Sequence, residues 1–533
     1  MTPTSAVEAL GVLRRSAQER RQSEARGEFR IVVQVGHCSQ SVGAADIAQT
    51  LASSAPDNTY VVIAGCDGAC FEAPRVIVTG PSGSQRFDRV SPNDADRILA
   101  AIDGGLDDDY EEAEDFFARQ CRVAMQDCGR LDGSDIDDYL IESGYQGLAK
   151  ALDSTAEDVI EEVKASGLRG RGGAYFPAAL KWEGVRNQEA RPAYLVVNSE
   201  EGEPGIFKDR HLMEGVPHRI IEGAAIAAYA AGAQQAYIYV NAEAELSAER
   251  MQTAASQAYD RGLLGENVLG SDFSLNVEIR RGAGGYVCGE ETTLLDTMEG
   301  YRREPRLRPP YPTEAGLFGK PTVINNPETL VSVPYILANG AKAFSEIGSD
   351  GDSGTKLISL SGSVNRPGVV EVPMGTTLRQ IVDDIGGGPP SGRTVTALAV
   401  GGPSSGVFPA SMLDTPIKPG MLHESGVMLG AGGVIALDDR TEVLDAVRKL
   451  AAYNADESCG KCTPCREGTP RIVEVIDRLR SGDGSPQDLD ELRYLADVVG
   501  AASLCGLGQA AGGPITSALH FFPTRFARGA GVS

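Results

Sequence analysis

The stretch Gly167-Leu-Arg-Gly-Arg-Gly-Gly-Ala-Tyr-Phe-Pro177, followed by Lys181, combines four glycines with two arginines in one short segment. Glycine lets backbone N–H groups approach an anion without a Cβ in the way, and a helix starting near Pro177 would add its positive end. A flexible surface turn would also be rich in glycine, but it would not explain why Arg169, Arg171 and Lys181 occur together. The stretch therefore predicts a loop that binds phosphate.

Strand and helix patterns alternate on the C-terminal side of this loop. We expect strands at 193–197, 236–240 and 275–279, with helices at 219–232 and 243–261 between them. Strands separated by helices of this length build a parallel sheet that binds ligands at the carboxyl ends of its strands. The pattern predicts a Rossmann-like α/β domain over residues 166–345, with its chemistry in the loops after the strands.

Those loops carry five carboxylates. The first is Asn198-Ser-Glu-Glu-Gly-Glu-Pro-Gly205, and the second, Arg281-Gly-Ala-Gly-Gly-Tyr-Val-Cys-Gly-Glu-Glu-Thr292, ends in two glutamates. Carboxylates repel phosphate but accept hydrogen bonds from ribose hydroxyls and a carboxamide. Solvated acidic loops would explain any one of these residues but poorly explain all five at strand ends. We therefore expect a nucleotide whose phosphate lies on the Gly167 loop and whose sugar faces the acids.

The N-terminal region, residues 29–106, shows a β-α-β-β order with cysteines at the strand ends, and it resembles thioredoxin-like ferredoxins. In those proteins C-x4-C and C-x3-C pairs hold a 2Fe-2S cluster. Here Cys66 and Cys70 supply the second pair and Cys38 supplies the first member, while Val42 or Gly43 stands at the fourth position. A fourth ligand would have to come from another chain or from a nearby side chain, the candidates being His37, Ser39 and Ser41. The alternative is a thioredoxin-like domain that has lost its cluster and only docks partners.

Several motifs together resemble the NADH-binding flavoprotein subunit of respiratory complex I and the homologous diaphorase subunits of NAD-linked formate dehydrogenases, hydrogenases and related oxidoreductases. They are the Gly167 loop, the Asn198 loop with Lys208-Asp-Arg210, Gly284 to Thr292, Pro321-Thr-Val-Ile-Asn-Asn-Pro-Glu-Thr329, and a later cysteine cluster. The resemblance covers about residues 110–525.

The resemblance implies two cofactor sites. It implies FMN on Gly170, Arg171, Gly172, Lys181, Asn198, Glu200, Tyr286, Gly289, Glu290, Asn325 and Asn326. It also implies NAD(H) near Phe176, Glu201, Glu203, Glu291, Arg308 and Tyr311. No catalytic acid or base is expected, because the flavin N5 accepts the hydride. Tyr175 departs from the family, which usually has a small residue there, so this side chain either narrows the nicotinamide side or points away.

The later cluster is Ser458-Cys-Gly-Lys-Cys-Thr-Pro-Cys-Arg-Glu-Gly468, with Cys505 far downstream. A C-x2-C-x2-C run with a distant fourth cysteine is typical of a 4Fe-4S cluster. The ligands would be Cys459, Cys462, Cys465 and Cys505, with helices at 470–479 and 488–499 forming the hairpin that returns the fourth. Zinc is the competing metal for four thiolates. The flavin domain in the same chain favours 4Fe-4S, and Lys461 and Arg466 would moderate the cluster charge.

The remaining segments complete a multidomain α/β protein. Residues 1–28 form a leader helix or a disordered arm, and residues 107–165 form a helical connector with helices at 110–130, 136–142, 146–152 and 156–165. Residues 354–440 resemble the small β-grasp domain of the family, with a strand at 426–429 and a helix at 377–385. The turn Gly430-Ala-Gly-Gly433 carries little functional weight. Residues 441–533 form a C-terminal helical bundle.

The formal net charge of −25 excludes nucleic acid as a partner. No apolar signal core or window of 18 apolar residues is present, so we expect a cytoplasmic protein without direct membrane insertion. The implied partners are NAD(H), a 2Fe-2S thioredoxin-like subunit and an iron–sulfur relay subunit of a larger complex.

The sequence thus predicts a diaphorase subunit that exchanges hydride between NAD(H) and FMN and passes single electrons through the 4Fe-4S cluster. The alternatives are a non-catalytic electron-relay or assembly scaffold and an electron-bifurcating variant that uses ferredoxin.

Overall fold

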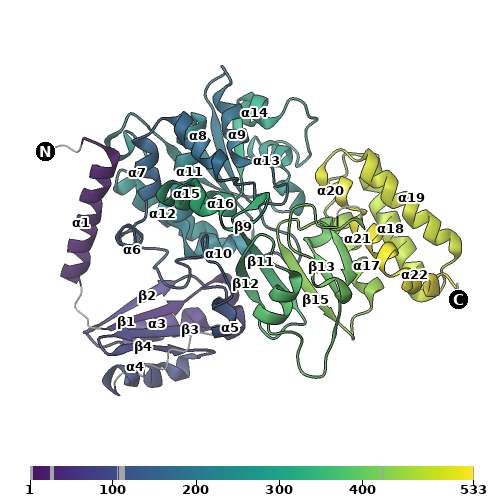
Figure 1. Ribbon diagram of the computed structural model, residues 1–533, viewed down its shortest axis with the longest axis horizontal. Helices are drawn as coiled ribbons and strands as arrows, with labels where there is room; N and C mark the ends of the chain where they lie inside the picture. Colours follow the sequence, from purple (N-terminus) through teal and green to yellow (C-terminus); the bar gives the residue numbers. More distant parts are fainter. Residues whose placement is uncertain (1–3, 25–28, 105, 107–113, 423–424, 532–533) are drawn as a thin grey trace.

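The computed structural model describes the chain except for residues 1–3, 25–28, 105, 107–113, 423–424 and 532–533. Parts of the predicted N-terminal arm and helical connector lie outside the described residues. The described part is a mixed α/β protein with sheets of four, four and five strands and one two-stranded hairpin. Figure 1 shows the N-terminal sheet, the parallel sheet with its helices, the five-stranded sheet and the C-terminal helices as successive regions.

The N-terminal region begins with helix α1 (Ala6–Glu24). Of the two expectations for residues 1–28, a leader helix or a disordered arm, the described residues therefore show the helix. The sheet that follows has the order β2-β1-β3-β4, with β2 parallel to β1 and the other pairs antiparallel. Ile31 and Val33 of β1 are fully buried against its helices. The elements are β1 (Phe29–Gln34), α2 (His37–Gln40), α3 (Ala44–Ser54), β2 (Thr59–Ala64), β3 (Arg75–Gly80), β4 (Gly83–Phe87) and α4 (Ala95–Gly104).

The connector is less helical than predicted. The predicted helix at 110–130 is wrong beyond α5 (Glu114–Phe117), because side chains replace the helical hydrogen bonds. The Glu371 carboxylate accepts the backbone N–H groups of Ala124 and Met125 at 2.8 and 2.9 Å. Three helices follow, and Thr155 caps the last of them as expected; they are α6 (Ile136–Ile141), α7 (Gln146–Leu152) and α8 (Ala156–Ala165).

The second sheet is parallel throughout, as predicted, with the order β7-β6-β5-β8. Its strands are β5 (Tyr194–Ser199), β6 (Gln235–Val240), β7 (Asn276–Arg281) and β8 (Thr322–Asn325). Strand β8 was not predicted; it has four residues and is buried along its whole length. The helices are α9 (Ala178–Arg186), α10 (Lys208–Gly215), α11 (Pro217–Ala231), α12 (Glu245–Asp260), α13 (Glu291–Met298), α14 (Pro312–Ala315), α15 (Pro327–Asn339) and α16 (Ala341–Ser345).

The third sheet has the order β12-β11-β15-β13-β14. The predicted strand at 426–429 is wrong: the Ser405 hydroxyl accepts the Met428 N–H and donates to the Met428 carbonyl, both at 2.7 Å, in place of a neighbouring strand. The predicted helix at 377–385 is present but is π-helical over Gln380–Ile385. The strands are β9 (Gly348–Ser349) and β10 (Asp352–Ser353) of the hairpin, then β11 (Thr355–Gly362), β12 (Gly368–Pro373), β13 (Val395–Val400), β14 (Gly406–Pro409) and β15 (Gly433–Asp438).

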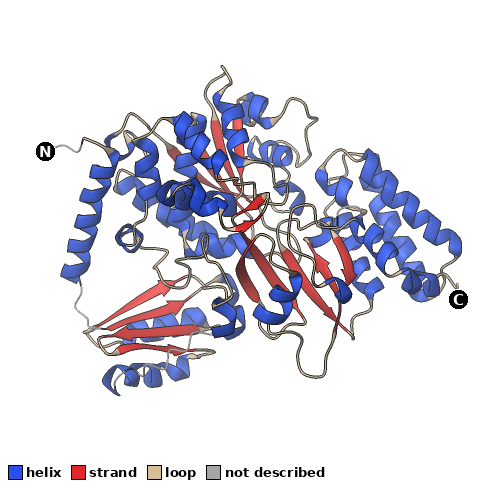
Figure 2. Ribbon diagram, in the orientation of Figure 1, coloured by secondary structure: helices blue, strands red, loops and turns tan. Residues whose placement is uncertain are grey.

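The C-terminal region is helical (Figure 2). The long helices α18 and α19 contain the two predicted helical segments, and α18 packs against both α19 and α17. The helices are α17 (Val443–Asp456), α18 (Thr463–Ser481), α19 (Pro486–Ala502), α20 (Gly506–Ala510), α21 (Gly513–Phe521) and α22 (Pro523–Gly529). Among the described residues, no helix is both long and apolar enough to span a membrane.

Candidate functional site

A cavity of about 410 Å³ lies where the parallel sheet, the five-stranded sheet and the C-terminal helices meet. The glycine loop supplies one wall, and the loops after β5 and β7 supply others, as expected for a parallel sheet that binds ligands at its strand ends. The predicted FMN and NAD residues all line this cavity except Arg171 and Tyr311. The structure therefore brings together residues that are up to about 150 positions apart in the sequence.

The glycine loop closes on itself before α9. Gly170 N–H donates to the Phe176 carbonyl at 2.8 Å, and Ala178 N–H donates to the Leu168 carbonyl at 3.0 Å. Gly173 has a φ of +118°, which favours glycine. A Cβ on Gly172 would lie 3.0 Å from the Cβ of Asn326. The loop therefore presents bare backbone to the cavity, which is the arrangement that suits an anion.

Two predicted cations of this stretch point in different directions. Lys181 lines the cavity, where its ammonium pairs with the Glu291 carboxylate and donates to the Ile324 carbonyl at 3.2 Å. Arg171 is buried and donates to the Ser353 carbonyl of β10 at 2.6 Å, so its guanidinium holds the hairpin rather than facing the cavity. Arg171 is therefore a predicted FMN residue that does not line the cavity in this structure.

Glu200 and Glu203 each have one buried carboxylate oxygen without a hydrogen-bond partner in the described structure. The other oxygen of Glu200 accepts from the Asn241 amide, and that of Glu203 accepts from the Tyr286 hydroxyl. Burial raises the pKa of each carboxyl to about 7. These two side chains therefore offer unsatisfied acceptors to a ligand that carries hydroxyl or N–H donors.

The other carboxylates of the site hold helix starts. Glu290 accepts the N–H groups of Thr292 and Thr293 at 3.0 and 2.9 Å, which makes it the N-cap of α13. Glu201 accepts the N–H of Asp209 at 2.8 Å at the start of α10. Both glutamates line the cavity while their carboxylates fix its walls.

The three predicted asparagines tie neighbouring loops together. The Asn198 amide donates to the Gly289 carbonyl at 2.8 Å, which joins the loops after β5 and β7. Asn325 accepts the Trp182 indole N–H at 2.8 Å, and Asn326 donates to Asp209 at 2.7 Å. Each amide is thus fixed in orientation where it borders the cavity.

Tyr175 lines the cavity, and its side chain also packs into the domain that contains the five-stranded sheet. Its hydroxyl donates to the Gly430 carbonyl at 3.0 Å, and its ring packs in the core of that domain. Gly430 and Ala431 line the cavity, so this turn forms part of the site, contrary to the expectation that it carries little functional weight. The turn lies at the site because parts of the chain that are distant in sequence pack together there. The local sequence does not indicate such a contact.

Tyr311 lies outside the cavity lining. Its side chain is 53% exposed, and its backbone stands at the N-cap of the short helix α14. Arg308, three residues earlier, lines the cavity and lies 3.6 Å from Glu290. The predicted NAD residues are therefore together except for this tyrosine.

The four C-terminal cysteines lie directly behind the cavity wall. Cys465 and Cys505 are buried in one apolar cluster with Val287 and Leu507, and Cys459 and Cys462 pack against it. Burial raises the pKa of the Cys465 thiol, and the other three cysteines raise it further. Val287 and Leu507 also line the cavity, so these two side chains belong both to the cavity wall and to the cluster that contains the cysteines.

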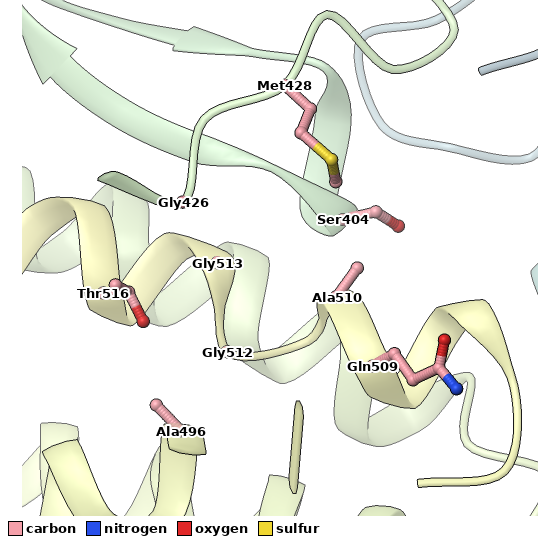
Figure 3. Close-up of a pocket in the computed structure, with 9 residues that line it drawn as sticks. All are labelled: Ser404, Gly426, Met428, Ala496, Gln509, Ala510, Gly512, Gly513 and Thr516. Atoms are coloured by element: carbon pink, nitrogen blue, oxygen red, sulfur yellow. The ribbon is translucent and has the colours of Figure 1, made fainter. Parts of the chain in front are cut away.

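A smaller hollow of about 180 Å³ adjoins the large cavity. Figure 3 shows Ser404, Met428 and Ala510 at its edge, and the same three residues line the large cavity. The hollow otherwise lies among α19, the Gly512 turn and α21. It extends the larger site toward the C-terminal helices.

Two of the three predicted N-terminal cysteines belong to one group of closely spaced possible ligands. Cys66 and Cys70 lie together, but Cys38 is exposed on the short helix α2 and lies outside their group. The third member of the group is His211 of α10, which the sequence did not predict as a ligand. The sequence did not indicate this contact, because the segment that carries Cys66 and Cys70 and helix α10 lie far apart along the chain.

Three family models match the chain. The Nuo51 FMN-binding domain matches residues 163–335, the SLBB domain matches residues 357–408, and the NADH-ubiquinone oxidoreductase-F iron-sulfur binding region matches residues 445–529. The first contains the glycine loop and both acidic loops, and the last contains the four cysteines.

Curated relatives match at high identity. The NADP-reducing hydrogenase subunit HndC of Solidesulfovibrio fructosivorans is 43% identical over 408 residues, which are 76% of this chain and 83% of the relative. The F 2 subunit of the NADH-quinone oxidoreductase of Rhizobium meliloti (strain 1021) is 45% identical over 405 residues, 76% of this chain and 96% of the relative.

A solved structure resembles nearly the whole chain. It is a chain of the NAD+-reducing [NiFe]-hydrogenase in the H2-reduced state, with a TM-score of 0.69 and 28% identity. The match covers 98% of this chain and 92% of that chain.

Proposed function

Since the chain belongs to the family of the F subunits of NADH-quinone oxidoreductase and the related hydrogenase subunits, we propose that it exchanges a hydride between NAD(H) and FMN held in the large cavity. It is an NADH-binding flavoprotein with a 4Fe-4S region, and its relatives are subunits of multisubunit oxidoreductases. The observation that carries the proposal is the shared wall of Val287 and Leu507 between the cavity and the four cysteines.

The residues present fit FMN. The bare backbone of Gly170 to Gly173 and the ammonium of Lys181 suit a phosphate. The free buried oxygens of Glu200 and Glu203 suit the hydroxyls and N–H groups of a nucleotide. Asn198, Asn325 and Asn326 bring amide groups to the same cavity.

The residues also fit a 4Fe-4S cluster. Cys459, Cys462, Cys465 and Cys505 supply four thiols in one partly buried cluster, and Lys461 and Arg466 stand close in sequence. FMN accepts a hydride as an electron pair, and a 4Fe-4S cluster accepts electrons singly, so the two together convert hydride into single electrons.

The residues of the chain itself bind and orient the two nucleotides and exclude water from them. Tyr286 lines the cavity, and its hydroxyl fixes one Glu203 oxygen so that the other stays free for a ligand. The Glu291 carboxylate positions the Lys181 ammonium at the cavity. Phe176 is 49% exposed at the rim, where an aromatic ring suits stacking on a nicotinamide or adenine ring.

The finer organisation is part of the same proposal. Residues 29–106 are a thioredoxin-like domain, 107–165 a connector, 166–345 the Rossmann-like FMN/NAD domain, 354–440 a β-grasp domain and 441–533 a helical cluster domain. The electrons pass to or from an iron–sulfur relay subunit, and a 2Fe-2S thioredoxin-like subunit is a second partner. The ten free cysteines support a cytoplasmic location, where thiols remain reduced.

The test is NADH-driven reduction of a one-electron acceptor by the purified, reconstituted chain. We expect Cys505→Ser to keep flavin reduction by NADH but to slow transfer to the acceptor. Cys121→Ser, which changes a half-buried cysteine outside the cluster, is the matched control. If Cys505→Ser reduced the acceptor as fast as the wild-type chain, the cysteine cluster would not be part of the electron path.

A further inference from the structure

Two cysteines of the N-terminal region meet a histidine of the cavity domain. The Sγ atoms of Cys66 and Cys70 and a ring nitrogen of His211 all lie within 4.8 Å of one another. The cysteines follow β2, and the histidine lies on α10. We propose that Cys66, Cys70 and His211 bind one zinc-class divalent cation that joins the N-terminal sheet to the cavity domain.

The orientation of His211 suits a metal ligand. Its Nδ1 lies 2.8 Å from the Phe207 carbonyl, so this nitrogen carries the proton and donates it. The Nε2 atom then has a free lone pair, and it lies 3.5 Å from the Cys70 Sγ. A ligating histidine commonly donates its other ring N–H to a carbonyl, which fixes both its tautomer and its orientation. His211 is also buried, with 3% of its surface exposed.

The loop that carries both cysteines is held before any ion binds. A Cβ on Gly65 would lie 2.4 Å from the Gly215 Cα of α10, and one on Gly68 would lie 2.3 Å from the Val369 carbonyl oxygen of β12. The Val369 N–H also donates to the Gly68 carbonyl at 2.9 Å. These close backbone contacts fix the loop between two domains, so the donor atoms need little reorganisation.

The geometry favours one ion over a binuclear cluster. A 2Fe-2S cluster takes two protein ligands on each iron, four in all. The structure instead gathers three donors at one point, and Cys38 lies outside the group. Two thiolates and one imidazole are a ligand set that tetrahedral zinc accepts, with the fourth position left to water. The 2Fe-2S cluster predicted from the sequence would need a fourth ligand besides these three donors.

The test measures zinc, iron and acid-labile sulfide in the purified full chain. We expect about one zinc per chain in addition to the iron and sulfide of one tetranuclear cluster. Cys66→Ser and Cys70→Ser should lose the zinc to background and keep the iron and sulfide. His211→Cys should keep the zinc, because a thiolate can replace the imidazole, whereas His211→Ala should lose it.

Cys121→Ser is the matched control, since Cys121 is half-buried like Cys70 but lies outside the group. Reconstitution of the wild-type chain with Co²⁺ gives a second readout that does not depend on how the variants fold. A thiolate-to-cobalt absorption band should appear, and added Zn²⁺ should abolish it. Wild-type protein without zinc and without this band would overturn the proposal. Loss of iron and sulfide in Cys66→Ser and Cys70→Ser would also overturn it, in favour of a binuclear cluster.

Discussion

Glu203 allows a pH test of the site at the scale of one residue. Burial raises its pKa from 4.5 to about 7, so between these values the folded protein holds a proton that the unfolded chain has released. The free energy of unfolding of the flavin-free protein therefore falls as the pH rises through this window. We expect Glu203→Gln to be more stable than wild type by about 2 kcal/mol at about pH 8 in urea unfolding.

The gain of Glu203→Gln should vanish below about pH 3.5, where the wild-type carboxyl is protonated in both the folded and the unfolded states. Glu278→Gln, which alters an exposed glutamate of β7, should show no pH-dependent gain. An equal gain at both pH values would contradict the burial of the Glu203 carboxyl.

Tyr175 gives a second test at the residue scale. Tyr175→Phe removes the hydrogen bond to the Gly430 carbonyl but keeps the ring in the core of the five-stranded domain. We expect a loss of about 1 kcal/mol in the free energy of unfolding and no change in the KM for NADH. A several-fold rise in that KM, with stability unchanged, would instead place the hydroxyl in the nicotinamide site.

At the scale of elements, the glycine loop should tolerate no side chain at Gly173. Gly173→Ala places an L-residue at a φ of +118° and a Cβ 3.4 Å from the Gly430 backbone. Such strain costs about 1–3 kcal/mol. We therefore expect FMN binding to weaken by about tenfold or more in a fluorescence titration.

Gly420→Ala is the control for the loop, because Gly420 has open space around its Cβ position and no positive φ. It should bind FMN like wild type. Wild-type affinity in Gly173→Ala would show that the phosphate lies elsewhere.

A buried ion cluster joins α10, α15 and β11. The Glu328 carboxylate accepts from Lys208 at 2.8 Å and from Lys356 at 2.6 Å, and all three side chains are at most 2% exposed. Glu328→Gln leaves buried ammonium groups without their shared counter-charge, so we expect a loss of about 3 kcal/mol in the free energy of unfolding. Glu328→Gln combined with Lys356→Met should recover part of this loss.

The control for this cluster is Glu346→Gln, which breaks an exposed pair with Lys342 and should cost less than about 0.5 kcal/mol. If Glu328→Gln and Glu346→Gln lowered the free energy of unfolding equally in urea, burial of the ion cluster would not be the cause of the larger expected loss.

Local patterns predicted the elements whose signals lie within their own sequence. The helix over Ala156–Ala165 with its Thr155 cap and the parallel strands β5 to β7 are examples. The predicted strand at 426–429 and the part of the predicted helix at 110–130 that follows Phe117 were wrong, because Ser405 and Glu371, distant in sequence, bond to the backbone there. Propensity alone contains no information on such partners.

At the scale of the whole molecule, spacing and glycine content indicated the cavity and the four-cysteine cluster. Their common wall of Val287 and Leu507 could not be predicted, because it depends on how separate domains pack. The hydrogen bond from Arg171 to the Ser353 carbonyl could not be predicted either. Nor could the short distances between His211, Cys66 and Cys70. Contacts between domains are therefore where the structure adds most to the sequence.

Hydride exchange in the cavity can be followed by visible absorption during an anaerobic titration of the FMN-loaded chain with NADH. We expect the oxidised-flavin absorption to bleach as NADH is added, and to bleach less readily in Glu203→Ala, where a free acceptor of the site is lost. A bound flavin whose spectrum does not respond to NADH would show that no hydride passes between NAD(H) and FMN in this cavity.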